Sequence, residues 1–281
     1  MHLNKKITRI GLFDSGIGGL TVLKELLNLP FTDYIYIADT ANVPYGQKTP
    51  EQILKYSHTI TAFLVEQKIN ALVIACHTSS AIALPHLQKM FPQLPIIGTI
   101  VQTMLHTIKQ TKNGRIGIMA TQASINSHIH KTELLAINPA LEVFEQACPQ
   151  LVPLIEAPIM DMQEIQNALR HYLTPLIDQN IDTLILGCTH YPLLAKEIKK
   201  IVGEHVTLIS SEKIIAQTLS DHCNTTLPEA KSITFYATGD THSVEQKIKM
   251  ILDKVVTVKH LDIHTHCQPI VESPKNLSNT I

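Results

Sequence analysis

Two look-alike segments constrain this chain more than any other feature of its sequence. One is AlaCysHisThr at residues 75–78, and the other is GlyCysThrHis at residues 187–190. Each follows a short run of aliphatic and β-branched residues, which is typical of a strand buried in a parallel sheet. A side chain just after such a strand lies at the carboxyl edge of the sheet, where open α/β sheets bind ligands. We therefore expect Cys76 and Cys188 to lie on opposite sides of one small-molecule site.

The bulk composition excludes several classes of protein. The chain has 281 residues, is 44% hydrophobic and carries a formal net charge of −1, so it can form one large or two medium domains with a good core. A near-neutral charge gives no reason to expect binding to nucleic acid or to an anionic membrane surface. No apolar run approaches the roughly 20 residues that span a bilayer, and the N-terminus lacks the apolar stretch of a signal peptide. We expect a cytoplasmic protein.

The five cysteines are odd in number and widely scattered, so free thiols are expected rather than a disulfide framework. His77 and His190 lie close to cysteines, which raises the question of zinc. The spacing of Cys188 and His190 is tighter than in structural zinc sites, and no second close pair completes a tetrahedral set, so no metal is expected. Structural thiols are the expectation for the other three, Cys148, Cys223 and Cys267.

Strand-like and helix-like segments alternate along the chain, which favours parallel sheets covered by helices. Strands are expected at residues 9–13, 34–38, 71–76, 96–97, 115–119, 141–144, 182–186, 206–209, 232–237 and 255–259. The two halves echo each other, since GlyLeuPheAspSer at 11–15 resembles GlyIleMetAlaThr at 117–121. We predict an α/β protein of two pseudo-symmetric doubly wound domains with the active site in the cleft between them. Residues 266–281 show little periodicity and are expected to form a mobile tail.

A glycine-rich turn follows the first expected strand, with the sequence AspSerGlyIleGlyGly at residues 14–19. Glycines allow a close backbone approach to an anion, and the helix that follows favours negative charge at its start. The turn lacks the full dinucleotide fingerprint, so we interpret it as a carboxylate-binding turn. The alternative is a plain strand–helix turn in which Asp14 or Ser15 caps the helix.

Two further segments carry candidate site residues. In AspThrAlaAsnValProTyrGly at residues 39–46, Pro44 and Gly46 predict a rigid loop whose amides can hold a carboxylate; the alternative is a surface turn packed by Tyr45. In CysProGlnLeuValProLeuIleGlu at residues 148–156, two prolines predict a stiff loop. Glu156 can orient a histidine there, or it can be a solvated helix residue. Most histidines are expected on helix surfaces, among them His58, His86, His106, His128 and His130.

Six motifs in order resemble the glutamate racemase family of the aspartate/glutamate racemase superfamily. They lie at residues 11–22, 39–46, 75–78, 120–124, 148–156 and 184–194. The resemblance implies two flavodoxin-like domains, the first completed by the C-terminal segment. We accordingly predict a first domain of residues 1–98 plus 210–265 and a second of residues 99–209. It also implies a homodimer and a cofactor-independent interconversion of L- and D-glutamate for peptidoglycan synthesis.

Racemisation removes the α-proton from one face of the substrate and returns a proton to the other. A thiolate is a suitable base only if its pKa is lowered by its surroundings. By the resemblance, Cys76 and Cys188 are the two bases, Asp14 assists near Cys76, and His190 assists Cys188 with Glu156 behind it. The substrate-binding positions that we carry over are Asp14, Ser15, Pro44, Tyr45, Gly46, His77, Thr78, Thr121, Thr189 and His190.

Residue 77 is a histidine where the family has asparagine. An imidazole is bulkier than an amide and can become a cation, so it can change substrate preference, alter the pKa of Cys76 or replace the amide contact. Two alternatives therefore stay open: a racemase of aspartate or another amino acid, and a low-activity member with a protein-binding role such as inhibition of DNA gyrase. The near-neutral charge argues against direct DNA binding. A pyridoxal-phosphate enzyme is disfavoured because no lysine lies in a Schiff-base context.

Overall fold

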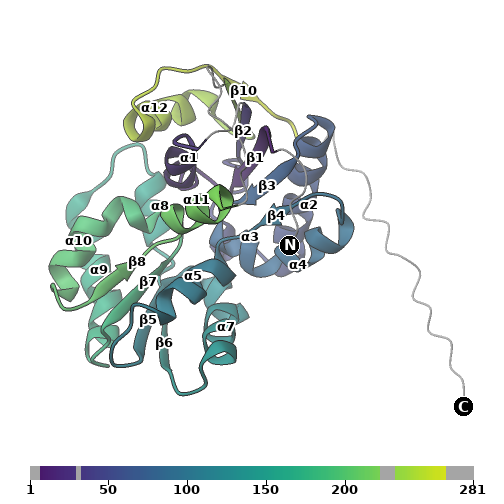
Figure 1. Cartoon of the computed structure of the whole chain (residues 1–281). Helices are drawn as coiled ribbons and strands as arrows, with labels where there is room; N and C mark the ends of the chain where they lie inside the picture. Colours follow the sequence, from purple (N-terminus) through teal and green to yellow (C-terminus); the bar gives the residue numbers. More distant parts are fainter. Residues whose placement is uncertain (1–6, 30–32, 222–231, 264–281) are drawn as a thin grey trace, which may run out of the picture.

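The computed structural model describes residues 7–29, 33–221 and 232–263 of the chain. These residues form two parallel sheets, each with helices packed around it (Figure 1). The expected mobile tail, Cys223 and Cys267 lie outside the described residues. Among the helices of the described ranges, none combines the length and the apolar character that crossing a bilayer requires.

The first sheet has six parallel strands in the order β10-β9-β2-β1-β3-β4. Its strands are β1 (Arg9–Asp14), β2 (Asp33–Ala38), β3 (Ala71–Ile74), β4 (Ile96–Ile97), β9 (Ser232–Ala237) and β10 (Val258–His260). Strand β9 pairs with β2 along its whole length, so the C-terminal segment completes the first sheet. We refer to this sheet and the helices packed on it as the first lobe.

The second sheet has four parallel strands in the order β6-β5-β7-β8. Its strands are β5 (Arg115–Ala120), β6 (Glu142–Ala147), β7 (Thr183–Gly187) and β8 (Thr207–Ile209); with its helices it forms the second lobe. The order repeats that of β2-β1-β3-β4, so β3 and β7 hold the same place in their sheets. This repeat is the structural basis of the similarity between the two cysteine segments. The predicted domain boundaries after residues 98 and 209 fall between the two sheets in the chain.

Helices cover both sheets. They are α1 (Leu20–Leu26), α2 (Pro50–Glu66), α3 (His77–Ile82), α4 (Leu84–Met90), α5 (Ile100–Ile108), α6 (Gln122–Ser127), α7 (Ile129–Ile137), α8 (Leu151–Glu156), α9 (Met162–Ile177), α10 (Ala195–Val202), α11 (Glu212–Ser220) and α12 (Thr241–Leu252), with 3₁₀ turns η1 (Tyr45–Gln47) and η2 (Tyr191–Leu194). Local sequence sets their starts. Thr49 and Gln52 form a capping box at α2, with Pro50 in its first turn, because proline lacks only an N–H that the helix does not use there.

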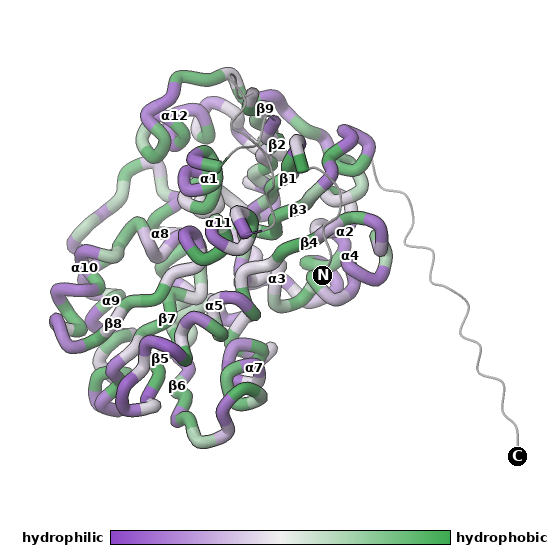
Figure 2. The backbone as a smooth tube through the Cα atoms, viewed as in Figure 1, coloured by the Kyte–Doolittle hydropathy of each residue, from purple (hydrophilic) through white to green (hydrophobic). Residues whose placement is uncertain are grey.

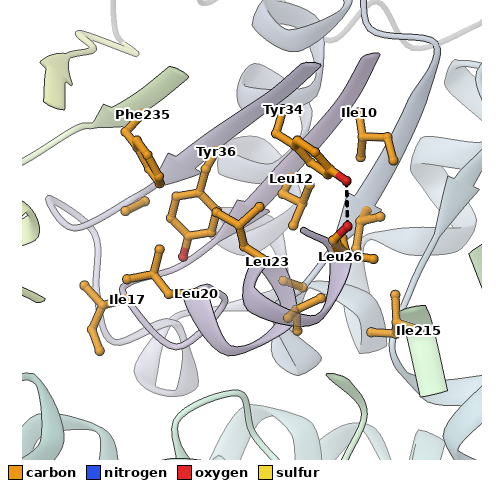
Figure 3. Close-up of a cluster of buried hydrophobic side chains, with 14 of the residues drawn as sticks. Ile10, Leu12, Ile17, Leu20, Leu23, Leu26, Tyr34, Tyr36, Ile215 and Phe235 are labelled. Atoms are coloured by element: carbon orange, nitrogen blue, oxygen red, sulfur yellow. Dashed lines mark hydrogen bonds between the residues drawn. The ribbon is translucent and has the colours of Figure 1, made fainter. Parts of the chain in front are cut away.

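The core of the first lobe shows how a helix is fixed on its sheet. Leu20, Leu23 and Leu26 recur every three residues along α1 and are fully buried, because this spacing places them on one helix face. Figure 3 shows this face turned toward the tyrosines of β2, where the Tyr34 hydroxyl donates to the Leu26 carbonyl at 2.6 Å. Each buried leucine contributes about 2 kcal/mol. The central strands β1 and β3 are largely green in Figure 2, as expected for strands buried on both faces of a sheet.

The segment at residues 148–156 was expected to be a stiff loop, and this expectation is wrong for most of it. Helix α8 occupies Leu151–Glu156. Pro153 stands at its third position, where the backbone N–H has no partner within the helix, so the proline does not interrupt it. The helix ends at Glu156 and therefore fixes the place from which that carboxylate projects.

The expectation of a surface position is also wrong for His130. This residue is 0% exposed, whereas His86, His106 and His128 are exposed as predicted and His58 is half-buried. A Cβ atom on Gly187 would lie 3.5 Å from Nε2 of His130. The imidazole therefore lies near the end of β7, and its Nε2 is 3.4 Å from Nδ1 of His77 in the first lobe.

Candidate active site

The carboxyl edges of the two sheets meet, and hydrogen bonds cross from one lobe to the other. Asp14 ends β1, and its Oδ1 accepts a hydrogen bond of 3.0 Å from the Thr189 hydroxyl of the second lobe. The Ile17 amide donates to Oε1 of Glu156 at 2.9 Å. The turn after β1 is therefore in direct contact with the residues that follow β7 and α8.

Two glycines of this turn are required for that contact. A Cβ atom on Gly16 would lie 2.0 Å from Oε1 of Glu156, and one on Gly18 would lie 2.4 Å from Oγ1 of Thr189 and 2.6 Å from Nδ1 of His190. At distances this short, a side chain at either position would displace these groups of the second lobe. The glycines thus serve close approach between the lobes.

The alternative in which Asp14 or Ser15 caps the following helix is wrong. Helix α1 begins at Leu20, and its N-cap Gly19 makes no side-chain capping bond. Instead, Oδ2 of Asp14 accepts a 3.0 Å bond from the Gly16 amide. The aspartate is therefore held inside the turn, facing the second lobe.

Cys76 follows β3 and forms the N-cap of α3. Its Sγ accepts a bond from the Ser79 amide at 3.5 Å and its thiol donates to Oγ of Ser15 at 3.7 Å. Burial, together with the negative charge of Asp14, raises the pKa of Cys76 to about 11 against the lowering effect of the Ser79 amide. In this structure Cys76 is a neutral thiol at physiological pH.

Cys188 follows β7 and faces an ionic pair instead. Its Sγ lies 3.6 Å from Nδ1 of His190, whose Nε2 lies 2.7 Å from Oε1 of Glu156. Burial lowers the pKa of His190, but its hydrogen bonds to Cys188 and Glu156 outweigh burial and hold the pKa well above the usual value. His190 is therefore an imidazolium at neutral pH, and a cationic imidazole beside a sulfur stabilises a thiolate.

Glu156 completes this arrangement as a carboxylate. Burial raises its pKa, but the hydrogen bond and the charge of His190 lower it more, with further lowering by the Ile17 amide and by Lys247. Glu156 and His190 are thus held as an ion pair. The expected order Cys188, His190, Glu156 is present in the structure.

Asp14 lies between the two cysteine environments. Burial raises the pKa of Asp14. This upward shift is partly opposed by the charge of His190, the Gly16 amide and the Thr189 hydroxyl. The resemblance implied a role near Cys76 alone. The hydrogen bond from the Thr189 hydroxyl also connects Asp14 to the residue next to Cys188.

A cluster of hydroxyl groups joins the lobes on another side. Oγ1 of Thr78 lies 2.8 Å from Oγ1 of Thr121 and 3.3 Å from Oγ of Ser124. A Cβ atom on Gly46 would lie 2.6 Å from Cβ of Thr121. Gly46, Thr78 and Thr121 are thus brought together, and their role in substrate binding stays a prediction. Ser124 was not singled out, although it belongs to the motif at residues 120–124.

Pro44 directly precedes η1 and Tyr45 is the first residue of this turn; the Val43–Pro44 peptide bond is cis. The Tyr45 ring packs against Cys76, and its hydroxyl donates to Oδ2 of Asp39. Tyr45 therefore shapes the wall of the site, with its hydroxyl committed to Asp39. Sequence reasoning missed Asp39, yet it directly follows β2 at the sheet edge where Asp14 ends β1, and that position is the signal that could have found it.

His77 directs its side chain toward the second lobe and the start of α11. Its Nε2 lies 3.1 Å from Oγ of Ser211 and its Nδ1 lies 3.4 Å from Nε2 of His130. The two rings are stacked with centroids 5.7 Å apart. Burial lowers the pKa of both, that of His130 to about 4, and the proximity of His130 further lowers that of His77. Both imidazoles are neutral at physiological pH.

The remaining cysteine of the described residues, Cys148, is structural. Cys148 is buried, its thiol lies 3.6 Å from the Gln146 carbonyl, and burial raises its pKa, as expected of a structural thiol. Within residues 7–29, 33–221 and 232–263, no three side chains of His, Cys, Asp or Glu are grouped to hold a metal ion.

The fold and the site together define an α/β enzyme with acid–base groups at the meeting edges of two parallel sheets. The Asp/Glu/hydantoin racemase family model matches residues 24–219. A glutamate racemase of Geobacter metallireducens is 44% identical over 213 residues, covering 75% of this chain and 78% of that protein. The chain belongs to the Asp/Glu/hydantoin racemase family and is an amino-acid racemase, an isomerase.

Solved structures agree with this assignment. A glutamate racemase isoform of Bacillus anthracis superposes with a TM-score of 0.86 at 35% identity, covering 92% of this chain and 98% of that one. A glutamate racemase of Francisella tularensis in complex with D-glutamate gives a TM-score of 0.83 at 32% identity, with the same coverage of both chains. The predicted two-lobed α/β fold is confirmed.

Proposed function

We propose that this protein interconverts L- and D-glutamate without a cofactor, using Cys76 and Cys188 as the two acid–base groups. One observation carries the proposal: two thiols at equivalent strand ends lie in opposite electrostatic environments at the edge where the lobes meet. Cys76 is a neutral thiol, whereas Cys188 lies beside the imidazolium of His190. A proton donor and a proton acceptor are therefore available at the same time.

In one direction the Cys188 thiolate takes the α-proton, and the Cys76 thiol gives its proton to the opposite face of the carbanionic carbon. The product is the other enantiomer, and the protein is left with a Cys188 thiol and a Cys76 thiolate. The reverse reaction restores the starting state, so protons balance over the two directions. Each positioned acid or base contributes roughly 10²–10⁴-fold in rate.

The substrate is held, in this proposal, by groups that already cross between the lobes. Hydroxyls of Thr78, Thr121 and Thr189 offer hydrogen-bond donors, and the amides of the turn after β1 can approach a carboxylate closely. Glutamate as substrate is supported by the glutamate racemases to which the chain is similar. On the same ground we propose a homodimer in the cytoplasm that supplies D-glutamate for peptidoglycan.

No observation favours a second function. The alternative substrate, aspartate or another amino acid, was motivated by His77, and its imidazole is engaged by Ser211 and His130. A role in protein binding, such as gyrase inhibition, has no feature of the described residues in its support. Both alternatives are separated from the proposal by the same experiment.

The test follows circular dichroism of purified protein with L-glutamate and no added cofactor. We expect the signal to decay to zero as the racemic mixture forms, and a panel of amino acids to give glutamate the highest kcat/KM. The matched control is the Cys76→Ala/Cys188→Ala double variant, which should leave the signal unchanged. A wild-type protein that leaves L-glutamate optically stable over hours at several pH values contradicts the proposal.

A further inference from the structure

A buried lysine of the first lobe reaches the end of a second-lobe helix. Lys247 lies on α12, which packs on β9, β10 and α1, and only 8% of the residue is exposed. Its neighbours Val244, Ile248 and Ile251 are buried in the first-lobe core. Lysine is rarely buried to this extent, because removing an ammonium from water is costly unless it is paired.

The ammonium is paired with the backbone of α8. Nζ of Lys247 donates to the Ile155 carbonyl at 3.2 Å and to the Ala157 carbonyl at 3.1 Å. The last carbonyls of a helix have no partner within it, and the helix dipole places negative charge there. The ammonium of Lys247, which comes from the other lobe, gives these carbonyls a hydrogen-bond donor and places a positive charge at the negative end of α8.

Glu156 lies between these two carbonyls in the chain. Its carboxylate accepts bonds from His190 and from the Ile17 amide, and the charge of Lys247 is one of the influences that lower its pKa. The ammonium therefore holds the backbone on both sides of the residue that orients His190. A shift of this helix end would move the carboxylate directly.

We propose that Lys247 is a positioning residue for proton transfer at Cys188. It fixes the end of α8 from across the lobe boundary and so sets where Glu156 holds the imidazole of His190. The inference rests on the proposed function, since it assigns Lys247 to the Cys188 side of the two-cysteine reaction. Lys247 itself acts only through Glu156 and His190.

The experiment compares Lys247→Met with Lys247→Arg, and uses Lys249→Met as the matched control. Lys249 lies on the same helix and is exposed. Lys247→Met keeps the aliphatic stem and removes the charge, so we expect kcat/KM for glutamate to fall about 10- to 100-fold, the range known for groups that orient a metal-ligating histidine. The acid limb of the pH profile should move to higher pH, because Glu156 loses a charge that keeps it ionised. Lys247→Arg should recover most of the activity, and Lys249→Met should match the wild type.

A second readout separates this inference from the proposed function. ¹⁵N NMR of labelled histidines, with the His190 signal identified by its loss in His190→Gln, reports the protonation of His190 without any substrate. Lys247→Met should shift the titration of that signal even if glutamate is not the substrate. The inference is overturned if Lys247→Met keeps the wild-type titration of His190 and the wild-type acid limb of the kcat/KM profile. This holds both when the variant keeps its activity and when it loses activity together with thermal stability. Absence of turnover in the wild type, with the NMR shift present, would count against the proposed function alone.

Discussion

The surroundings of Cys76 and Cys188 differ far more than their positions in the fold. Both cysteines follow the third strand in the same sheet order, β2-β1-β3-β4 and β6-β5-β7-β8. Cys76 meets neutral partners, the Ser15 hydroxyl and the Ser79 amide, with the carboxylate of Asp14 nearby. Cys188 meets the His190–Glu156 ion pair. A pseudo-symmetric scaffold thus places one cysteine after β3 and one after β7, while the charged and polar groups around the two cysteines differ.

The largest expected effect comes from removing one thiol at a time. Cys76→Ala and Cys188→Ala should each lower racemisation by more than about 10³-fold, because each removes one of two required acid–base groups. In D₂O, each variant should still exchange the α-proton of one enantiomer, since the remaining thiol can remove and return a proton on its own face. NMR of the recovered L- and D-glutamate measures this exchange.

The variants Cys76→Ala and Cys188→Ala should incorporate deuterium into opposite enantiomers of glutamate. The double variant serves as the control and should label neither. Exchange of the same enantiomer by both single variants would show that the cysteines do not serve opposite faces.

A smaller effect is expected from neutralising the ion pair on the Cys188 side. Glu156→Gln keeps the shape of the side chain but removes a charge that helps to raise the pKa of His190. We expect kcat/KM to fall about 100-fold at neutral pH, and the alkaline limb of the profile to move to lower pH because His190 loses its proton sooner. Measurement of kcat/KM from pH 6 to 10 tests this.

Glu164→Gln, at an exposed position in the first turn of α9, is the matched control and should behave as the wild type. An unchanged alkaline limb in Glu156→Gln would mean that the ion pair does not govern proton transfer at Cys188. The difference between the two cysteines would then lie in solvation alone.

The smallest expected effect concerns stability and the buried histidines His77 and His130, which meet across the two lobes. Burial lowers the pKa of His130 to about 4, below the ordinary value of about 6.5 that it regains on unfolding. The unfolded chain therefore binds more protons between these values, so stability is lost as the pH falls from about 6.5 toward 4. For His130 alone the loss between pH 7 and pH 5 is about 2 kcal/mol.

His130→Gln should reduce this loss, as measured by urea unfolding at pH 7 and pH 5. His77→Asn should reduce it in the same direction, because the pKa of His77 is also lowered by burial and by His130. The exposed His106, replaced in His106→Gln, provides the control. Equal acid sensitivity in His130→Gln and the wild type would show that the imidazole is not held neutral in the folded protein.

Much of the fold could be predicted because its determinants are local. Apolar runs placed nearly every strand within a few residues of its observed bounds, and Thr49 with Pro50 placed the start of α2. The parallel order followed from the alternation of strands and helices. Errors occurred where a partner distant in the chain decides the outcome, as at His130, whose buried imidazole stacks on that of His77 from the other lobe.

The candidate site divides in the same way. Strand-end positions pointed to Asp14, Cys76 and Cys188, and the motifs drew attention to Glu156 and His190. Lys247 gave no signal, because a lysine on an amphipathic helix usually faces water. Asp39 lies directly after the second expected strand, but it was not among the predicted site residues.

By itself, the sequence determined two repeated parallel sheets and the delivery of one cysteine by each, because burial patterns and strand ends depend on residues close together in the chain. Only the tertiary structure decided how the two thiols differ. It set Glu156 behind His190, turned His77 toward His130 and Ser211, and brought Lys247 to the end of α8. Electrostatic environments depend on burial and on charges from distant segments, and these exist only once the lobes have come together.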